Sequence, residues 1–382
     1  MKSKSGDKQI RGSHANRPYS RRRVWGFRFL AFSLSLAVGL LALEILVRWL
    51  ELEGPVYPMA KQAIVLYYED PNGQVRLTPN WEGYVSGVWT QINANGFRDI
   101  AYSSKPGPGT IRIAVLGDSY TMGDGVSLEK SYPKQLQALL RERHQVEVLN
   151  CGISATNTKQ QVPTLRDVLE RFKPDVVVLG YNVNDFKHYK TTRFENLQKA
   201  GFHYHVHDDE TVTVNRDLNL LHRIKLAIRQ RSYLWRYLAR LRSSGGVSID
   251  LVAQVRQNVG DRNHLNSIKA VTAMQRLCDA HGVRFVVFVL PGLLDVPATA
   301  RVIDEYPFHD LHDMIREQLG LHGVKCFDLV DAFAGKRIDH LIVSQRDRHY
   351  NDTGNALIAD AMAQRLVDHI HKRRSNTNEQ SP

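Results

Sequence analysis

The stretch from residue 111 to residue 125 constrains the fold more than any other part of the chain. Its nearly continuous apolar run, Ile111 to Leu116, predicts a strand that is covered on both faces. A Gly-Asp-Ser turn follows directly, in which small residues let the chain bend sharply and leave the Ser119 hydroxyl exposed. Open α/β sheets place their sites at the carboxyl ends of such strands. We therefore interpret Ser119 as a catalytic nucleophile, with a purely structural turn as the alternative.

Three further polar blocks follow in an order that suits such a serine: Asn150–Gly152, Asn184–Asp185 and Asp347–His349. The first two come after expected strands, and the third precedes the last expected helix. With Ser119, these blocks resemble those of the SGNH, or GDSL-type, serine hydrolase family, in its membrane-anchored bacterial branch. The resemblance covers roughly residues 95 to 370, and four blocks in register are far more specific than one.

The resemblance implies a role for each site residue. Ser119 is the nucleophile, His349 the general base, and Asp347 the carboxylate that orients the imidazole. The backbone N–H groups of Ser119 and Gly152, with the side-chain amide of Asn184, are expected to form the oxyanion hole. The mechanism requires no cofactor and no metal ion.

The chain departs from the family pattern at two positions. In the block that the family writes as Gly-x-Asn-Asp, this chain has Asn182 in place of the glycine. Asn182 is therefore an alternative to Asn184 as the oxyanion donor. The aspartate adjacent to Asn184 favours Asn184. Many members place the catalytic aspartate three residues before the histidine, where this chain has Arg346, whereas Asp347 precedes His349 by two.

The positive charge of the chain is local. The formal net charge is +12, but residues 1–28 hold nine Lys and Arg against Asp7, and residues 216–242 hold eight against Asp217. The remainder is slightly acidic. This distribution argues against a nucleic-acid-binding domain and requires a separate explanation for each basic segment.

Residues 24–50 are apolar apart from Arg28, Glu44 and Arg48, and are long enough to cross a bilayer as a helix. The basic residues before them predict a cytoplasmic tail, residues 1–23. The anchor would then lie in the inner membrane of a bacterium, and the rest of the chain would lie in the periplasm. The alternatives are a cleaved signal peptide and a buried soluble helix. We favour an uncleaved anchor because no small-x-small cleavage site follows the run.

Beyond the anchor, residues 51–106 are expected to be an extended linker, residues 107–372 the hydrolase domain and residues 373–382 a disordered tail. The domain alternates strands and helices, which predicts a doubly wound parallel sheet, and the resemblance implies a flavodoxin-like, three-layer α/β sandwich. We expect further strands at 146–149, 176–180, 283–290 and 324–329, and helices at 132–143, 160–172, 268–281, 311–319 and 355–371.

An insertion at about residues 187–264 interrupts the domain as a lid-like subdomain. Three alternating histidines, His203, His205 and His207, indicate one face of a surface hairpin, and no later ligand spacing supports a zinc site. The second half of the insertion has Leu and Trp at helical spacing with Arg on the other faces. Such a helix packs on the domain as a lid, lies on the membrane surface or binds an anionic polymer, and we favour packing.

Two smaller features complete the sequence analysis. Cys151, Cys278 and Cys326 match no metal motif and are expected to be buried thiols. Asn93–Asp99 predicts a turn that places Arg98 against the domain, where we expect a structural ion pair rather than an anion-binding site.

The sequence therefore predicts a membrane-anchored periplasmic esterase that cleaves O-acyl esters, acetyl esters above all, through an acyl-serine. Resemblance to the branch associated with cell-surface polysaccharides implies acylated carbohydrate as the substrate. An O-acyltransferase using the same site is the alternative enzyme, and a non-catalytic glycan-binding protein of the same fold is the alternative outside catalysis. The sequence indicates no oligomeric state.

Overall fold

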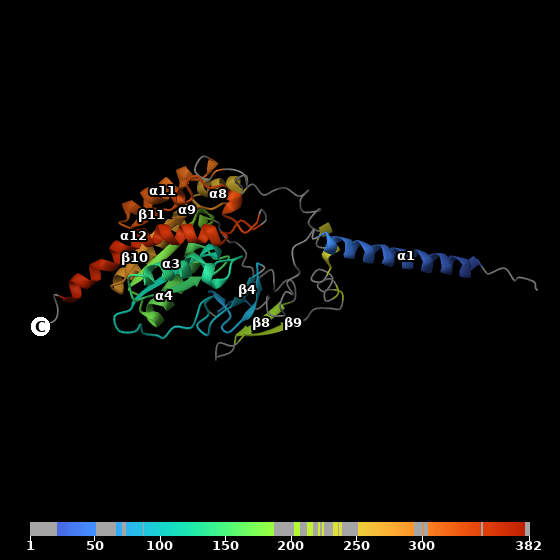
Figure 1. Cartoon of the computed structure of the whole chain (residues 1–382), viewed down its shortest axis with the longest axis horizontal. Helices are drawn as coiled ribbons and strands as arrows, with labels where there is room; N and C mark the ends of the chain where they lie inside the picture. The colour runs from blue at the N-terminus through green and yellow to red at the C-terminus, as the bar shows by residue number, and fades with distance from the viewer. Residues whose placement is uncertain are drawn as a thin grey trace, which may run out of the picture. The chain divides into compact units, whose positions relative to one another are not determined.

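The computed structural model describes residues 21–50, 66–70, 74–86, 88–186, 202–206, 212–216, 221, 224, 232–235, 237–238, 251–293, 301, 305–344 and 347–378 (Figure 1). The chain divides into two units. One contains residues 1–54 together with 231–246, and the other contains residues 55–230 together with 247–382.

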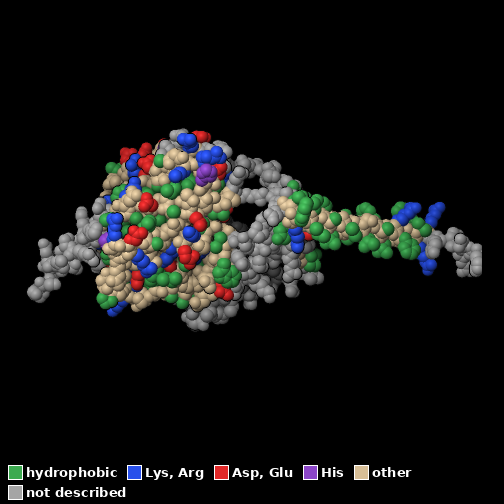
Figure 2. Space-filling model, viewed as in Figure 1, with side chains coloured by type: hydrophobic (Ala, Val, Ile, Leu, Met, Phe, Trp, Pro, Cys, Tyr) green, Lys and Arg blue, Asp and Glu red, His purple; other side chains and the backbone are tan. Residues whose placement is uncertain are grey.

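Helix α1, Arg21–Trp49, dominates the first unit. Its 29 residues extend for about 44 Å, which exceeds the roughly 30 Å of a bilayer core. Apolar side chains cover the helix along its length, and Lys and Arg gather at its amino-terminal end (Figure 2). By length and composition α1 is able to cross a membrane. A signal sequence near the amino terminus has the same length and composition. The predicted apolar helix is thus present.

A five-stranded parallel sheet forms the centre of the second unit. Its strands are β5 (Ile111–Gly117), β6 (Val146–Gly152), β7 (Val176–Asn182), β10 (Arg284–Leu290) and β11 (Cys326–Asp328). Their spatial order is β11-β10-β7-β5-β6. In chain order this is 2-1-3-4-5 read from β6, the flavodoxin-like arrangement. The predicted doubly wound α/β fold is confirmed, with β11 shorter than the expected strand.

Helices cover both faces of the sheet: α3 (Tyr132–Arg141), α4 (Thr158–Phe172), α8 (Leu251–Gly260), α9 (Asn263–Ala280), α11 (His309–Leu321) and α12 (Asp352–Asn378). Helix α3 packs with α12, whereas α9 packs with α4, α8 and α11 (Figure 1). Right-handed crossovers require this division into two layers. Helix α12 continues to Asn378, so residues 373–378 of the predicted disordered tail belong to this helix. Residues 379–382 lie outside the described residues.

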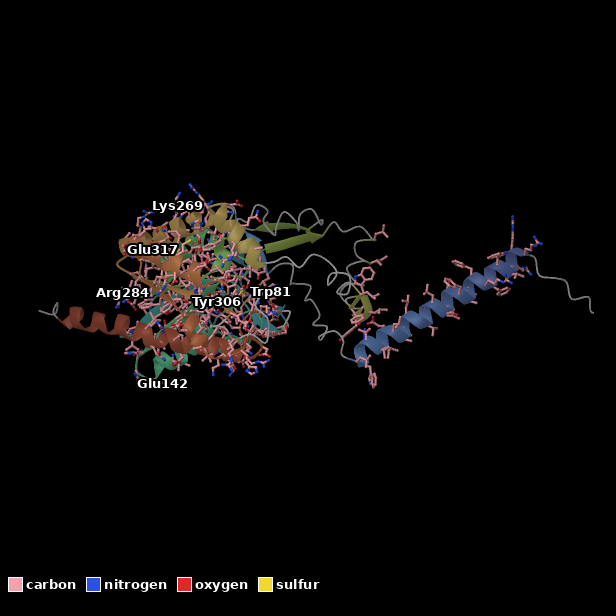
Figure 3. All side chains as sticks on the ribbon, turned by 90° about the horizontal axis from the view of Figure 1, so that it is seen from above. Trp81, Glu142, Lys269, Arg284, Tyr306 and Glu317 are labelled. Carbon is pink, nitrogen blue, oxygen red and sulfur yellow. The ribbon has the colours of Figure 1, made fainter. Side chains whose placement is uncertain are left out.

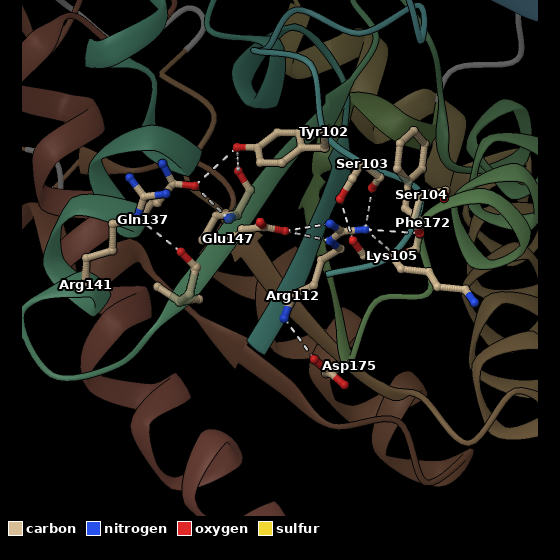
Figure 4. A network of polar contacts seen from close by, with 12 residues as sticks. Tyr102, Ser103, Ser104, Lys105, Arg112, Gln137, Arg141, Glu147, Phe172 and Asp175 are labelled. Atoms are coloured by element: carbon tan, nitrogen blue, oxygen red, sulfur yellow. Dashed lines mark hydrogen bonds and ion pairs between the residues drawn. The ribbon is translucent and has the colours of Figure 1, made fainter. Parts of the chain in front are cut away.

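The amino-terminal end of β5 is fixed by a buried arginine (Figure 4). The Arg112 side chain has no exposed surface and donates to Glu147 Oε2 from Nε at 2.9 Å and from Nη2 at 2.6 Å. Its Nη1 donates to the carbonyl oxygens of Ser103 and Phe172 at 2.9 and 2.7 Å. The backbone N–H of Arg112 donates to Asp175 Oδ2 at 2.8 Å. These contacts join β5 to β6, to the end of α4 and to the segment that enters the domain.

The lead-in to the domain differs from the predicted extended linker. Its described part forms two antiparallel hairpins, β1 (Tyr67–Glu69) with β2 (Val75–Leu77) and β3 (Glu82–Val85) with β4 (Val88–Gln91). Apolar residues of these hairpins are buried with two residues of the domain in a small second core: Leu66, Leu77, Trp81, Ile92, Met122 and Ile153. Trp81 of this second core is buried, like Tyr306 of the main core. The charged side chains of Glu142, Lys269 and Glu317 are exposed (Figure 3). Burial of this apolar surface is what folds the lead-in onto the domain.

The insertion contains the predicted hairpin, β8 (Phe202–Val206) paired with β9 (Val212–Arg216). The side chains of His203 and His205, and all of His207, lie outside the described residues. The described apolar side chains of the following segment are exposed: Leu221, Ile224, Trp235 and Leu238. At the end of the insertion α8 does pack on the core through Val255.

The three cysteines are all free thiols. Cys151 and Cys278 are buried as expected, whereas Cys326 is half-buried.

Candidate active site

Ser119 is the first residue of a single helical turn, α2 (Ser119–Met122), that follows β5 directly. Asp118 caps this turn, because its Oδ1 accepts a hydrogen bond from the backbone N–H of Tyr120 at 3.0 Å. Gly123 ends the turn at a φ of 82°, a conformation that glycine adopts without strain. The Ser119 side chain remains half-exposed at the carboxyl edge of the sheet.

Three glycines form the surface on which this turn rests. Gly117, Gly152 and Gly180 pair in register on the adjacent strands β5, β6 and β7. A Cβ on Gly152 would overlap the backbone nitrogen of Met122, and one on Gly117 would overlap Thr121 Oγ1. The absence of side chains at these positions therefore allows α2 to approach the sheet closely.

His349 joins the serine to a carboxylate. Its Nε2 lies 2.8 Å from Ser119 Oγ, and its Nδ1 lies 2.6 Å from Asp347 Oδ1. The backbone N–H of His349 also donates to Asp347 Oδ1, at 3.2 Å. The structure thus brings together three residues that the sequence places up to 230 positions apart. A spacing of two between Asp347 and His349 is sufficient for the contact.

The charges around His349 favour its protonated form. Burial alone would lower the pKa of the imidazole, but the hydrogen bond to Asp347 and the nearby charges of Asp124, Asp347 and Asp118 outweigh it, so the pKa is raised. Burial likewise opposes ionisation of Asp347, but its hydrogen bond and charge interaction with His349 lower the pKa of that carboxyl below its ordinary value. The pair is arranged to stabilise an imidazolium next to Ser119.

Asn184 lies at the end of β7, in the short 3₁₀ turn η3 (Val183–Phe186). One hydrogen of its side-chain amide is donated to Asp118 Oδ2 at 2.9 Å, which fixes the amide with its nitrogen toward the Ser119 turn. Asn182, the rival donor, is fully buried, and its Oδ1 accepts the backbone N–H of Asn184 at 3.1 Å. Asn182 therefore shapes the turn, and Asn184 is the amide next to the serine.

Gly152 differs from its predicted role. Its backbone N–H, expected to be an oxyanion donor, donates instead to Asn150 Oδ1 at 3.1 Å, and the residue is buried. The physical reason is that the last residue of β6 lies under α2, where the side chain of Asn150 is close enough to accept the bond. Gly152 serves the site through its lack of a side chain.

These residues converge at the point where the chain order of the strands reverses. Ser119 follows β5 and Asn184 follows β7, and these two strands are neighbours in the sheet. Connections leave β5 and β7 toward opposite faces of the sheet there. Ligand sites of flavodoxin-like folds occur at this place.

Sequence reasoning missed two side chains beside the site. Asp124 interacts electrostatically with His349, and its Oδ1 accepts a hydrogen bond from Ser154 Oγ at 2.7 Å. The ring of Tyr120 lies against that of His349 with centroids 5.0 Å apart. Both residues belong to the 111–125 stretch, so their proximity to Ser119 in sequence was the available signal.

Arg98 lies behind the serine turn, where an ion pair was expected. Its side chain is buried and donates to backbone carbonyls, from Nη1 to Gly123 at 2.5 Å and to Met122 at 3.1 Å, and from Nη2 to Val126 at 2.7 Å. Arg98 thus holds the loop that carries Asp124. The neighbouring Asp99 makes the ion pair, with Lys134 Nζ at 2.8 Å.

A second imidazole–carboxylate pair lies in the described part of the domain. His312 Nδ1 is 2.9 Å from Asp328 Oδ1, and His312 Nε2 is 2.9 Å from the hydroxyl of Tyr306. His312 is fully buried, and the Tyr306 hydroxyl also accepts the backbone N–H of Gly292. The four groups satisfy one another, so this pair is structural, and of these two imidazoles His349 is the one that faces a serine.

Curated relatives match parts of this chain. An acetylxylan esterase of Xylanibacter ruminicola is 32% identical over 117 residues, which cover 28% of this chain and 24% of the relative. An arylesterase of Vibrio mimicus is 36% identical over 75 residues, which cover 19% of this chain and 38% of the relative. The chain therefore matches about a quarter of the first relative's length and less than two fifths of the second's.

Solved structures are also similar to this chain. The acetyl xylan esterase AlAXEase has a TM-score of 0.38 and 19% identity, covering 67% of this chain and 100% of its own. The esterase EstA from Pseudoalteromonas sp. has a TM-score of 0.36 and 15% identity, covering 68% and 98%. A profile of the GDSL-like lipase/acylhydrolase family matches residues 115–357, which include Ser119 and His349. The chain belongs to the GDSL-like lipase/acylhydrolase family.

Proposed function

We propose that this protein is a serine esterase that cleaves O-acyl esters through a covalent acyl-Ser119. The observation that carries the proposal is the continuous series of contacts from Asp347 through His349 to Ser119 Oγ, at 2.6 and 2.8 Å. A hydroxyl next to an oriented imidazole is the arrangement that makes serine nucleophilic. The half-exposed position of Ser119 leaves the oxygen open to a substrate.

In the first half of the reaction, Ser119 Oγ attacks the carbonyl carbon of the ester while His349 Nε2 takes the hydroxyl proton. The tetrahedral oxyanion accepts hydrogen bonds from the backbone N–H of Ser119 and from the second amide hydrogen of Asn184. The first amide hydrogen is already held by Asp118, so the donor is oriented before the substrate arrives. The bond to the alcohol oxygen then breaks, and the His349 imidazolium returns the proton to that oxygen.

In the second half, water replaces the alcohol. His349 Nε2 takes a proton from the water, whose oxygen attacks the acyl carbon of acyl-Ser119. Collapse of the second tetrahedral intermediate releases the carboxylic acid and restores the proton to Ser119 Oγ. Throughout both halves Asp347 holds the Nδ1 hydrogen and stabilises the imidazolium.

For the substrate we propose acetyl esters on polysaccharide. The support is the matching relative described as an acetylxylan esterase. The fold alone does not select a substrate, so the proposal rests on this relative and on the chemistry of the site.

For the location we propose an uncleaved anchor in the inner membrane, with the domain in the periplasm. The support is the length of α1 and the basic residues at its amino-terminal end. Protease treatment of spheroplasts that carry a C-terminal tag tests this arrangement, because a cytoplasmic domain would remain protected.

The catalytic proposal is tested with the full chain in detergent. A fluorophosphonate should label the wild type, and acetylated xylan should release acetate, whereas Ser119→Ala should do neither. Ser127→Ala, an exposed serine eight residues away, is the matched control and should behave as wild type. An unlabelled wild type would contradict the proposal. Loss of acetyl groups from the xylan only when a sugar alcohol is added, with the acetyl group recovered as the sugar ester rather than as acetate, would assign acyl transfer instead.

A further inference from the structure

We infer that the segment with the described residues 232–235 and 237–238 is a second membrane-contacting element, which is built onto α1 and binds the anionic bilayer surface. These residues belong to the same compact unit as α1, although they lie about 190 positions further along the chain. The inference rests on the proposal that α1 is the membrane anchor, and it does not depend on the chemistry of Ser119.

The contact is made by the carboxylate of Glu44, near the carboxyl end of α1. Its Oε1 accepts the backbone N–H of Tyr233 at 2.8 Å, and its Oε2 accepts the backbone N–H of Leu234 at 2.9 Å. Oε2 also accepts the hydroxyl of Ser232 at 2.8 Å. The first backbone donors of the helical turn that begins at Tyr233 are thus satisfied by a side chain of another helix.

The hydroxyl of Ser232 completes the cap, because it accepts a hydrogen bond as well as donating one. While its proton is donated to Glu44, Ser232 Oγ accepts the backbone N–H of Trp235 at 3.0 Å. Three consecutive backbone N–H groups, those of residues 233 to 235, are therefore all paired. A helix start whose first three described backbone donors are paired is suited to the boundary of a bilayer, where water is scarce.

The same contacts explain an acidic residue in an otherwise apolar helix. Glu44 accepts four hydrogen bonds in total, because Arg48 Nε also donates to Oε1 at 3.0 Å. The Arg48 guanidinium in turn lies 4.7 Å from the centre of the Tyr233 ring. An unpaired carboxylate in such a helix would be costly, and this one is fully compensated.

The pattern of exposure on α1 locates the contact at one end of the helix. Val47 is buried and Glu44 is half-buried, one turn apart on the same face, whereas the apolar side chains along the rest of α1 are exposed. Residues 232–234 are thus attached where α1 emerges from the membrane in the proposed topology.

The outward side of this element has the composition of a bilayer-surface helix. Trp235 and Leu238 lie three residues apart on one face, and their side chains are 52% and 50% exposed. Residues 231–246 contain four arginines and no acidic residue. Apolar anchors with neighbouring Arg are the features that bind a helix to anionic lipid. Attachment to α1 places this face at lipid headgroups, so the lipid surface is the partner that we assign.

The test uses the full chain with a fluorescent probe at Leu238→Cys, reconstituted into vesicles of phosphatidylglycerol and phosphatidylethanolamine. Spin-labelled lipid should quench this probe roughly threefold or more strongly than a probe at Leu321→Cys, an exposed leucine of the other unit. Phosphatidylcholine vesicles should give weaker quenching. The wild type, with its buried or half-buried cysteines, is the labelling blank.

Glu44→Ala in the Leu238→Cys background should reduce the quenching toward that of the Leu321 probe, and Glu44→Gln, which keeps an acceptor oxygen, should retain part of it. Leu43→Ala, at the adjacent exposed position of α1, should leave it unchanged. Soluble-ester hydrolysis in detergent should be the same in all variants, so a failure here is distinct from a failure of the esterase proposal. Equal quenching of the two probes would overturn the inference.

Retention of α1 is a second consequence. The element needs Glu44, so the protein isolated from membranes should carry both an N-terminal and a C-terminal tag in one band. A product that begins beyond residue 50 would overturn the inference, because the cap of residues 233–235 would then be lost.

Discussion

Asn184 Nδ2 donates to Asp118 Oδ2 over 2.9 Å, which joins the end of β7 to the residue that precedes the nucleophile. Because Asp118 accepts only, this bond decides which end of the Asn184 amide faces the substrate. The same aspartate caps α2 through the Tyr120 N–H. One carboxylate therefore orients both the serine turn and the amide donor.

Asp118→Asn should reverse the Asn184 amide, because the new side-chain NH₂ group needs an acceptor. The carbonyl oxygen of Asn184 would then point at the developing oxyanion. We expect kcat to fall by about 10²–10³, as for Asn184→Ala, with little change in KM. The double variant should be no slower than Asn184→Ala alone, and additive losses measured by steady-state kinetics would contradict the orienting role.

The activity should increase with pH through the pKa of His349, because only the neutral imidazole accepts the Ser119 proton. This pKa is raised, so the acid limb of kcat/KM should lie above the ordinary imidazole value of about 6.5. Asp124→Asn removes a charge that favours the imidazolium and should move this limb to lower pH. Asp331→Asn, an exposed carboxylate in the same unit, is the control and should leave the profile unchanged.

Gly152→Ala should displace the serine turn, because the new Cβ meets the backbone nitrogen of Met122. We expect a loss of about 1–3 kcal/mol in the free energy of unfolding, together with a large fall in kcat. Gly320→Ala, in α11, is the matched change, because a Cβ there meets nothing within 4 Å. It should stabilise the protein by roughly 0.5–1 kcal/mol, and chemical denaturation of both variants measures the difference.

Arg98→Met should leave the carbonyls of Met122, Gly123 and Val126 without their buried donor. Loss of these bonds should cost about 3 kcal/mol of unfolding free energy and lower kcat, since the loop also carries Asp124. Arg98→Lys should recover part of the unfolding free energy and part of kcat. Arg337→Ala, which removes an exposed arginine, should leave the unfolding free energy nearly unchanged, and equal losses in the two variants would contradict the role of Arg98.

The sequence by itself determined the strands of the central sheet, most of the helices that cover it and the residue types of the proposed site. Continuous apolar runs such as Ile113–Leu116 have one stable environment, the middle of a covered sheet, so β5, β6, β7 and β10 could be predicted closely. Element ends were less certain, and α9 begins at Asn263 rather than at residue 268. The four polar blocks carried their chemistry in residue type and order.

Tertiary structure alone decided which atoms meet. Whether the Gly152 N–H faces a substrate or Asn150 Oδ1 depends on the placement of α2, which no local pattern encodes. The lead-in hairpins fold because Trp81 and Ile92 are buried in one cluster with Met122 of the domain. Glu44 is explained only by backbone donors about 190 residues away. Hydrogen bonds and packing between distant segments depend on three-dimensional proximity. The local propensity of a segment for helix or strand does not predict which distant segments will lie next to it.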